Sequence, residues 1–146
     1  MSDSVQAVRQ IILGDQSLVD SLTTGGVIKV RQGHAGQTDR LPYVLLWSIT
    51  DRPVHYLGGR TGTREGVVQV DVYANDLAEA GEIAAQIGDV IDDFGRGWTT
   101  ENDDTVWVMS ILEEASRAND QMTRDGAEKA IAGVQTDYRL VYKSTS

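Results

Sequence analysis

The chain has 146 residues, 40% of them hydrophobic and 24% charged, and a formal net charge of −9 at neutral pH. This composition is typical of a single globular domain over residues 1–146 and too small for most two-domain enzymes. The chain has no cysteine, which excludes disulfide scaffolds, thiolate metal sites and cysteine nucleophiles. Its two histidines are too few for a metal site built from histidines alone. Because no apolar run approaches the roughly 20 residues that cross a bilayer, and Met1–Ser4 lacks a signal-peptide pattern, we expect a soluble intracellular protein.

The charges are segregated along the chain. Residues 29–64 contain six basic and two acidic residues, a balance of +4, whereas residues 65–114 contain thirteen acidic residues and one base, a balance of −12. The two segments either neutralise each other within the fold or leave two faces of opposite sign, which favour association between identical subunits.

The first forty residues predict two helices and a short strand. Residues 3–13 carry apolar side chains at helical spacing, Gly14 ends that helix, and Asp15 begins a second, shorter one. Residues 27–30 follow a glycine pair and predict a strand, and residues 33–40 predict a polar loop.

The next segments predict a hairpin with a long connection. Residues 43–49 are almost continuously apolar, which predicts a central strand covered on both faces. Residues 51–66 contain Pro53 and four glycines, which predicts a long, mobile hairpin loop. Residues 67–74 alternate between apolar and polar side chains, as in a strand with one face on the core.

The clearest element is a helix over residues 76–94. Asp76 and Glu79 form a capping-box pattern at its start. Its apolar side chains gather on one arc, its acids lie opposite, and it contains no Lys or Arg. Gly81, Ala85 and Gly88 form a strip of small residues, which predicts the close approach of another backbone because glycine within a helix costs about 1 kcal/mol.

The remaining residues complete the sheet. We expect a polar loop at 98–104 around an exposed Trp98, a strand at 105–112, a polar stretch at 115–132 with a helical turn at 127–131, and a final alternating strand at 134–142. The fold class predicted is therefore α+β: one antiparallel or mixed sheet with the N-terminal helix and the long helix packed on it.

No sequence motif points to catalysis or to a cofactor. Phosphate-binding loops, serine nucleophile elbows, zinc-binding helices and calcium loops are all missing from the sequence. His55 falls in the predicted loop, which is poor support for an oriented base. Paired acids such as Glu113 and Glu114 point to opposite faces of a strand, so we interpret them as solvated surface and expect no metal site. The basic segment is too sparse for tight contact with DNA.

Several features follow one another in a characteristic order. A helix ends at Gly14-Asp15, a strand follows Gly25-Gly26, and then come Leu41-Pro42-Tyr43-Val44, His55 with its glycine-rich loop, residues 68–74 and the helix from Leu77. In residues 4–95 and again at 136–142, the chain resembles the tail-completion proteins of long-tailed bacteriophages, which are also called tail-terminator or head-to-tail joining proteins.

This resemblance implies a structural virion protein that is not an enzyme and uses no cofactor. It implies rings, usually of six copies, that cap the finished tail tube, present a surface to the head connector and let DNA pass without specific binding. The expected partners are further copies of the chain, the tail tube protein and the head-completion or connector protein. The expected location is the head–tail interface of the virion, and the host cytoplasm during assembly.

Simple geometry is compatible with a ring of six. A 146-residue globule has a radius of gyration of roughly 15 Å and a diameter of about 38 Å. Six touching spheres of this size leave a hole about 38 Å across and four leave about 16 Å, whereas a DNA duplex is roughly 20 Å wide.

Two roles remain open for the acids of the long helix and the loop at Asp103-Asp104. They line the lumen and repel DNA, or the helix acids pair with arginines of the next subunit. The candidate inter-subunit or lumen residues are Glu79, Glu82, Asp89, Asp92, Asp93, Arg52, Arg60 and Arg64. The candidate docking residues are His55 and Tyr56 of the 51–66 loop, together with Trp98.

Two other classes of protein fit the sequence. One is a small α+β module that binds a peptide or small molecule, for which a deep apolar pocket would be evidence. The other is a small hydrolase or an antitoxin-like regulator, for which a pocket with His55 beside a carboxylate, or a DNA-binding dimer, would be evidence.

Overall fold

A computed structural model of the chain describes residues 3–24, 26–33, 41–56, 59–101, 104–123 and 130–144, without the side chains at 24, 27, 55–61, 119–123, 130–131 and 144. Its helices are α1 (Asp3–Leu13), α2 (Gln16–Ser21) and α3 (Leu77–Phe94). Its strands are β1 (Thr23–Thr24), β2 (Val27–Ile28), β3 (Val30–Gln32), β4 (Tyr43–Tyr56), β5 (Gly59–Ala74), β6 (Gly97–Glu101), β7 (Asp104–Thr123) and β8 (Ala130–Ser144). None of the helices described is long and apolar enough to cross a bilayer.

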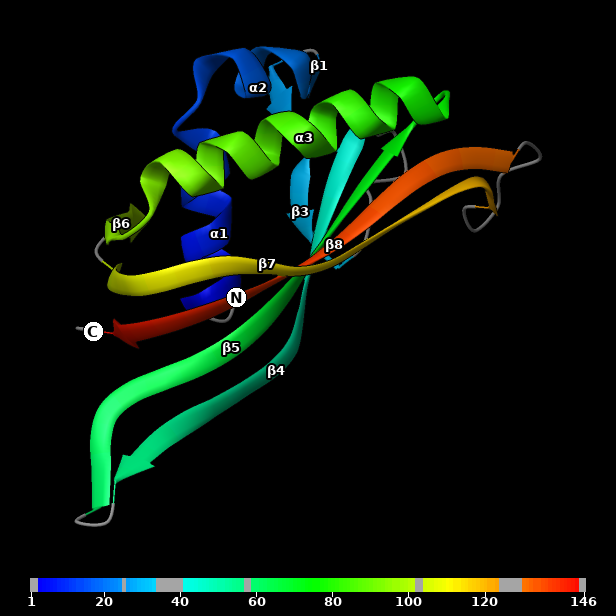
Figure 1. The fold of residues 1–146 in the computed structure, drawn as a ribbon. Helices are drawn as coiled ribbons and strands as arrows, with labels where there is room; N and C mark the ends of the chain where they lie inside the picture. The colour runs from blue at the N-terminus through cyan, green and yellow to red at the C-terminus, as the bar shows by residue number, and fades with distance from the viewer. Residues whose placement is uncertain are drawn as a thin grey trace.

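Six strands form one mixed sheet in the order β3-β4-β5-β8-β7-β6, and β1 and β2 form a separate antiparallel pair. β3 is parallel to β4, and the other neighbours are antiparallel. The sheet is strongly twisted, and the β4–β5 and β7–β8 hairpins project from it in different directions (Figure 1). The predicted α+β class with one mixed sheet is confirmed.

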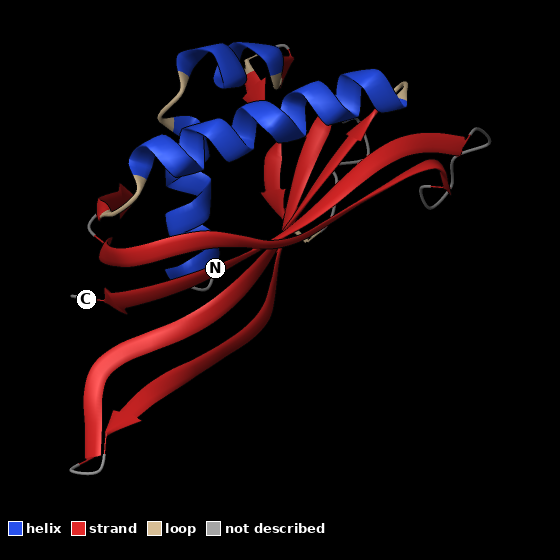
Figure 2. Ribbon diagram, viewed as in Figure 1, coloured by secondary structure: helices blue, strands red, loops and turns tan. Residues whose placement is uncertain are grey.

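The helices and the sheet share one apolar core, and the helices stand out against the strands in Figure 2. The predicted alternation of β5 places Val68, Val70 and Val72 in this core. The apolar arcs of α1 and α3 pack against them with, among others, Val8 and Ile87. The two periodicities, 3.6 in the helices and 2 in the strand, therefore converge on the same buried layer.

The starts of α2 and α3 have the expected caps. The Asp15 side chain accepts a hydrogen bond from the backbone N–H of Leu18 at 2.9 Å, and Asp76 accepts one from Glu79 at 2.8 Å. Each cap satisfies a backbone donor that has no partner within its helix. The carboxylates also lie at the positive ends of the helix dipoles.

The opposite face of the sheet contains the buried Asp71. Its carboxylate accepts hydrogen bonds from the Trp47 indole at 2.9 Å and from the Gln69 amide at 2.8 Å. Tyr43 to Leu46 are buried, but Ile49 is 52% exposed. The predicted cover on both faces of residues 43–49 is therefore confirmed only for the first half of that segment.

The long loop predicted at 51–66 is wrong. Residues 51–56 and 59–66 continue β4 and β5 as a two-stranded ribbon, here called the β4–β5 ribbon. The pairing of β4 with β3 ends at Leu46, so Pro53 lies where β4 has no outer neighbour among the described residues and a missing donor is tolerated. The register shifts between Pro53 and His55, and Gly62 takes a positive φ of 81° opposite this shift, as at a β-bulge.

The polar stretches predicted at 98–104 and 115–132 are also largely strands. Residues 97–101 form β6, β7 extends to Thr123, and β8 begins at Ala130. A helical turn was predicted at 127–131. Residues 130 and 131 are instead part of strand β8, and residues 127–129 lie outside the described part of the chain. Polar composition was misleading because successive residues 112–118 of β7 are all exposed, so this strand lacks the alternation of a strand with one buried face.

Gly66 lies where α1 meets the root of the β4–β5 ribbon. A Cβ added there would lie 3.3 Å from the Ser4 Cβ and 3.3 Å from the backbone oxygen of Thr50. We expect Gly66→Ala to lower the free energy of unfolding by roughly 1–3 kcal/mol, because a buried helix and a strand backbone must shift. Urea unfolding followed by circular dichroism measures this change.

The matched control is Gly81→Ala in α3, where an added Cβ meets no atom within 4 Å. This substitution should raise the free energy of unfolding by about 0.5–1 kcal/mol, through helix propensity alone. Equal stabilities of the Gly66→Ala variant and the unmodified chain would contradict the close contact at Gly66.

Candidate functional site

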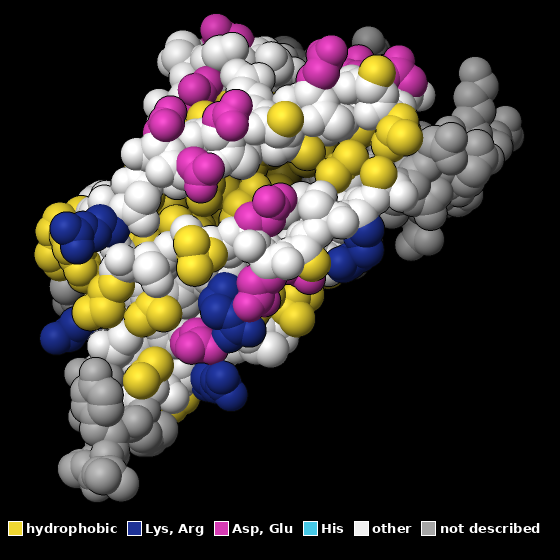
Figure 3. Space-filling view, viewed as in Figure 1, with side chains coloured by type: hydrophobic (Ala, Val, Ile, Leu, Met, Phe, Trp, Pro, Cys, Tyr) yellow, Lys and Arg dark blue, Asp and Glu magenta, His cyan; other side chains and the backbone are white. Residues whose placement is uncertain are grey.

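A groove separates α3 from strands β7 and β8. It has a volume of about 390 Å³, and Figure 3 shows it as a hollow with hydrophobic side chains inside and acidic side chains at its border. We call it the α3 groove; its lining residues are Gly81, Ala84, Ala85, Gly88, Asp89, Asp92, Glu113, Ser116, Val134, Thr136 and Tyr138. It contains three carboxylates and no basic side chain.

The small residues of α3 border this groove instead of packing against a backbone. An added Cβ at Gly81 would meet nothing within 4 Å, and one at Gly88 would meet only the Tyr138 hydroxyl, at 3.5 Å. The predicted close approach of another backbone is therefore wrong within the described residues. The strip leaves space on the surface of the helix.

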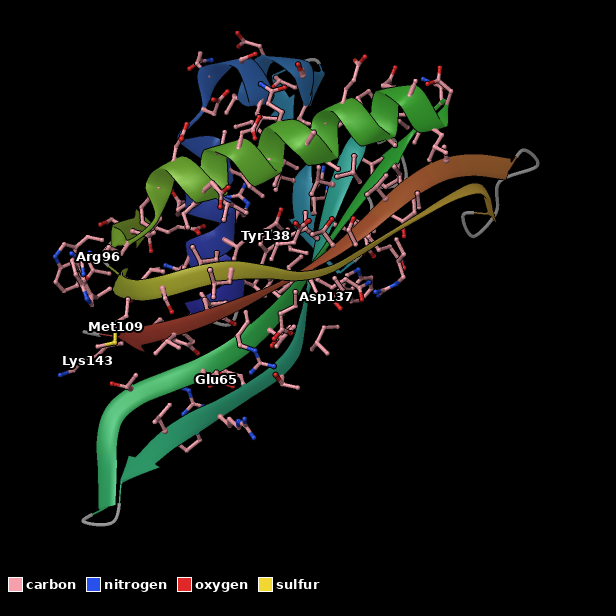
Figure 4. All side chains as sticks on the ribbon, viewed as in Figure 1. Glu65, Arg96, Met109, Asp137, Tyr138 and Lys143 are labelled. Atoms are coloured by element: carbon pink, nitrogen blue, oxygen red, sulfur yellow. The ribbon has the colours of Figure 1, made fainter. Side chains whose placement is uncertain are left out.

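Tyr138 forms part of the groove floor. Figure 4 shows it on the α3 side of β8, with its neighbour Asp137 on the opposite side. Its pKa is raised to about 12, first by burial and then by the nearby carboxylates of Glu113 and Asp92. The hydroxyl is therefore neutral at physiological pH and lies in a negative environment.

The candidate acids of α3 lie on its outward surface. Glu82, Asp89, Asp92 and Asp93 are exposed, and Glu79 is half-buried beside the cap of the helix. Asp89 and Asp92 reach the α3 groove, where the structure adds Glu113 of β7 to them. Asp104 is exposed at the start of β7, and Asp103 lies outside the described residues.

Two of the three candidate arginines of the β4–β5 ribbon have partners within their own chain. Arg52 pairs with Glu65 at 3.2 Å, and Arg64 pairs with Asp51 at 2.9 Å. Arg60 lies in β5, where its backbone pairs with that of His55, but its side chain and those of His55 and Tyr56 are outside the description.

Both faces of the ribbon root are held by charged hydrogen bonds. On one face, Glu65 also pairs with Arg139 of β8, and Arg139 pairs in turn with Glu114 of β7. On the other face, the buried Tyr142 hydroxyl donates to the Asp51 carboxylate at 2.7 Å. Burial, followed by this carboxylate, raises the pKa of Tyr142 above its ordinary value.

Trp98 is exposed, as predicted, with 56% of its surface accessible. Its ring lies 5.1 Å from that of Trp107 in the neighbouring strand β7. Trp47 and Trp107 are both half-buried, so neither is a fully buried core residue. The Trp47 indole N–H donates a hydrogen bond to Asp71. Trp98 is thus the most accessible of the three indoles.

Strands β7 and β8 contribute site residues that were not predicted from the sequence. Glu113 enters the α3 groove, and Arg139 and Tyr142 hold the ribbon root, although none of the three was a candidate. The sequence shows the alternation of apolar and polar residues in 134–142, which contains Arg139 and Tyr142. It does not show the register in which this strand pairs with distant strands. Within the described residues, no group of three or more metal-ligating side chains that could hold an ion is present.

Comparison with known proteins gives one family. The sequence model described as tail completion protein gp17 matches residues 6–126. No curated protein sequence matches the chain.

The bond between Tyr142 and Asp51 can be tested by Tyr142→Phe. We expect this substitution to lower the free energy of unfolding by about 1.5–3 kcal/mol, because a buried hydrogen bond to a charged group is lost. Tyr73→Phe is the matched control, since the Tyr73 hydroxyl lies 3.5 Å from Asp71 and should contribute much less. Equal losses in urea unfolding would contradict the assigned role of Tyr142.

Asp71 predicts a specific dependence of stability on pH. Burial raises its pKa above the ordinary value, opposed in part by the hydrogen bonds from Gln69 and Trp47. Its favourable contribution is therefore complete below the unfolded pKa of about 4 and is lost as the pH rises through the folded pKa. Urea unfolding at a series of pH values should show the stability of the unmodified chain falling relative to Asp71→Asn above about pH 4. A constant difference would contradict this.

Proposed function

Because the chain belongs to the family of tail completion protein gp17 and is thus a structural protein of the phage tail, we propose that it closes the end of the tail tube as a ring. The family match over residues 6–126 is the observation that carries this proposal. In the proposed role, the ring stops the addition of tube subunits and offers a surface to the head connector. Assembly takes place in the host cytoplasm, and the finished ring lies at the head–tail interface.

The β4–β5 ribbon is the element proposed to dock on the tube. It extends beyond the helices (Figure 1), so that a partner can reach both of its faces. Its root is held by the Arg52–Glu65 and Asp51–Arg64 pairs, which give the projecting strands a defined direction. Beyond Leu46, β4 has no outer neighbour among the described residues, so its backbone donors and acceptors there are available to a partner.

The acidic face of α3 is proposed to keep DNA from adhering as it passes. Glu82 and Asp93 are exposed on this helix outside the α3 groove, and the helix carries no basic residue. A lumen lined by such side chains repels phosphate groups, and the passing duplex is therefore not held. Pairing of these acids with Arg52 or Arg64 of a neighbour is less favourable, since both arginines already have intramolecular partners.

The alternative of a small-molecule or peptide-binding module has only the α3 groove in its favour. That groove is a surface hollow bordered by three carboxylates, unlike the enclosed apolar site that such a module would require. The ring-forming role accounts for the projecting ribbon as well.

The docking role predicts that the ribbon tip is dispensable for folding and required for capping. Residues 54–63 are replaced by Asn-Gly, which joins the paired residues Pro53 and Arg64 by a two-residue turn. The ion pairs at the root remain, so thermal unfolding should change little. Addition to tail tubes purified from particles made without the chain, followed by electron microscopy, should show capped tubes with the unmodified protein and bare ends with the shortened one.

The control for this experiment is Ile49→Ser, which alters an exposed residue of β4 outside the deleted segment. This variant should cap tubes as the unmodified protein does. Capping by the shortened chain would contradict the docking role, and bare tube ends with the unmodified protein would contradict the proposed function itself.

A further inference from the structure

One end of the sheet carries aromatic, methionine and basic side chains together. Arg96 precedes β6, Trp98 lies in β6, Trp107 and Met109 lie in β7, and Lys143 lies in β8 opposite Trp107. Figure 4 shows Arg96, Met109 and Lys143 at this same end. These five residues are called the cationic patch.

The cationic patch has the composition of a protein interface. Trp98 is 56% exposed and Met109 40% exposed, although both are large hydrophobic side chains. Tryptophan, methionine and arginine are the residue types enriched where interfaces are buried, and tryptophan and arginine often dominate the binding energy.

The two cations of the patch have no ion-pair partner within the described part of the chain. Arg9, Arg52, Arg64, Arg117 and Arg139, in contrast, each pair with a carboxylate. Arg96 is also the single base of the strongly acidic segment 65–114. The chain has a net charge of −9, and Arg96 and Lys143 are two of its few positive charges left unpaired within the described residues.

The α3 groove is complementary to this patch in charge and in shape. Its border carries Asp89, Asp92 and Glu113, which form no ion pair with any described residue. Its floor is apolar or made of small residues, and its volume of about 390 Å³ leaves room for a large aromatic side chain. Aromatic side chains bury roughly 150–250 Å² each, which makes an indole an effective anchor for such a hollow.

We propose that the cationic patch of one copy docks into the α3 groove of the next copy, with Trp98 over the groove floor and Arg96 facing Asp92 and its neighbours. This contact joins two different surfaces of identical chains. A head-to-tail contact of this kind repeats from copy to copy and closes into a ring when the rotation allows it. The inference rests on the proposed ring and names the surfaces that hold it together.

The lack of cysteine in the chain allows a direct test. Met109→Cys in the patch and Ala85→Cys in the groove are introduced together, both at exposed positions. The full-length variant is assembled on tail tubes purified from particles made without the chain, oxidised, and separated on a denaturing gel without reductant. The expected result is a ladder at multiples of the 15.9 kDa chain. Each single variant can form nothing beyond a dimer.

The matched control carries Ile49→Cys and Leu77→Cys, which are exposed hydrophobic residues outside both surfaces. It should cap tubes and give no ladder. Cross-links from residue 109 to the tube protein, instead of to a second copy, would overturn the inference, as would capped tubes without any cross-linked chain.

A charge exchange tests the same contact independently. In the two-cysteine chain, Arg96→Asp alone and Asp92→Arg alone should each lower the ladder yield at least about tenfold, because like charges then face each other. The two changes combined should restore it. Asp93→Arg is the control, since Asp93 is exposed on α3 but does not line the groove, and it should retain the yield.

The outcomes separate the two proposals. Tubes capped by the unmodified chain, with no ladder or with no rescue by the exchanged pair, overturn the contact and leave the capping role intact. Bare tubes with the unmodified chain overturn both. The substituted positions are all exposed, and circular dichroism of each variant verifies that it is folded.

Discussion

The antiparallel pairing of β5 with β8 is the constraint on which the rest of the molecule depends. It runs from Arg64 opposite Tyr142 to Ala74 opposite Ala132 without a register shift. Because side chains alternate along each strand, this register determines which residues enter the core and which face away from the helices. A slip of one residue would place Asp71 among the valines of the core and would also separate the groups that hold the ribbon root.

How far the fold can be predicted depends on where each segment lies relative to the core. α3 and the inner half of β5 were predicted correctly, since a cap, an apolar arc and an alternating strand all report burial of one face. The β4–β5 ribbon was mistaken for a loop because its stability comes from cross-strand partners such as Arg52 and Glu65, which no local window of sequence reveals. The β7–β8 hairpin was missed for a related reason, because strands wetted on both faces lose the hydrophobic alternation.

The candidate site was predictable in its charge but not in its assembly. The acidic surface of α3 and the exposure of Trp98 follow from the sequence, and both are present in the structure. The α3 groove, in contrast, requires Glu113 and Tyr138 from strands far along the chain. Arg52 and Arg64, which were expected to reach a neighbour, form ion pairs within their own chain, whereas Arg96 and Lys143 have no ion-pair partner among the described residues. The segregation of charge along the sequence therefore does not by itself predict the charged surfaces of the molecule. These surfaces depend on how the strands are arranged in the sheet.

The tight packing at Gly66 has a mechanical consequence for the ribbon. Ser4 of α1 and the Thr50 backbone oxygen come within 3.3 Å of the position where a Cβ would lie, and paired charges grip the same stretch on both faces. This close packing leaves no room for a hinge at Gly66. A force applied to the β4–β5 ribbon must therefore be transmitted to the first turn of α1 and to the core of the domain, as a rigid lever would transmit it.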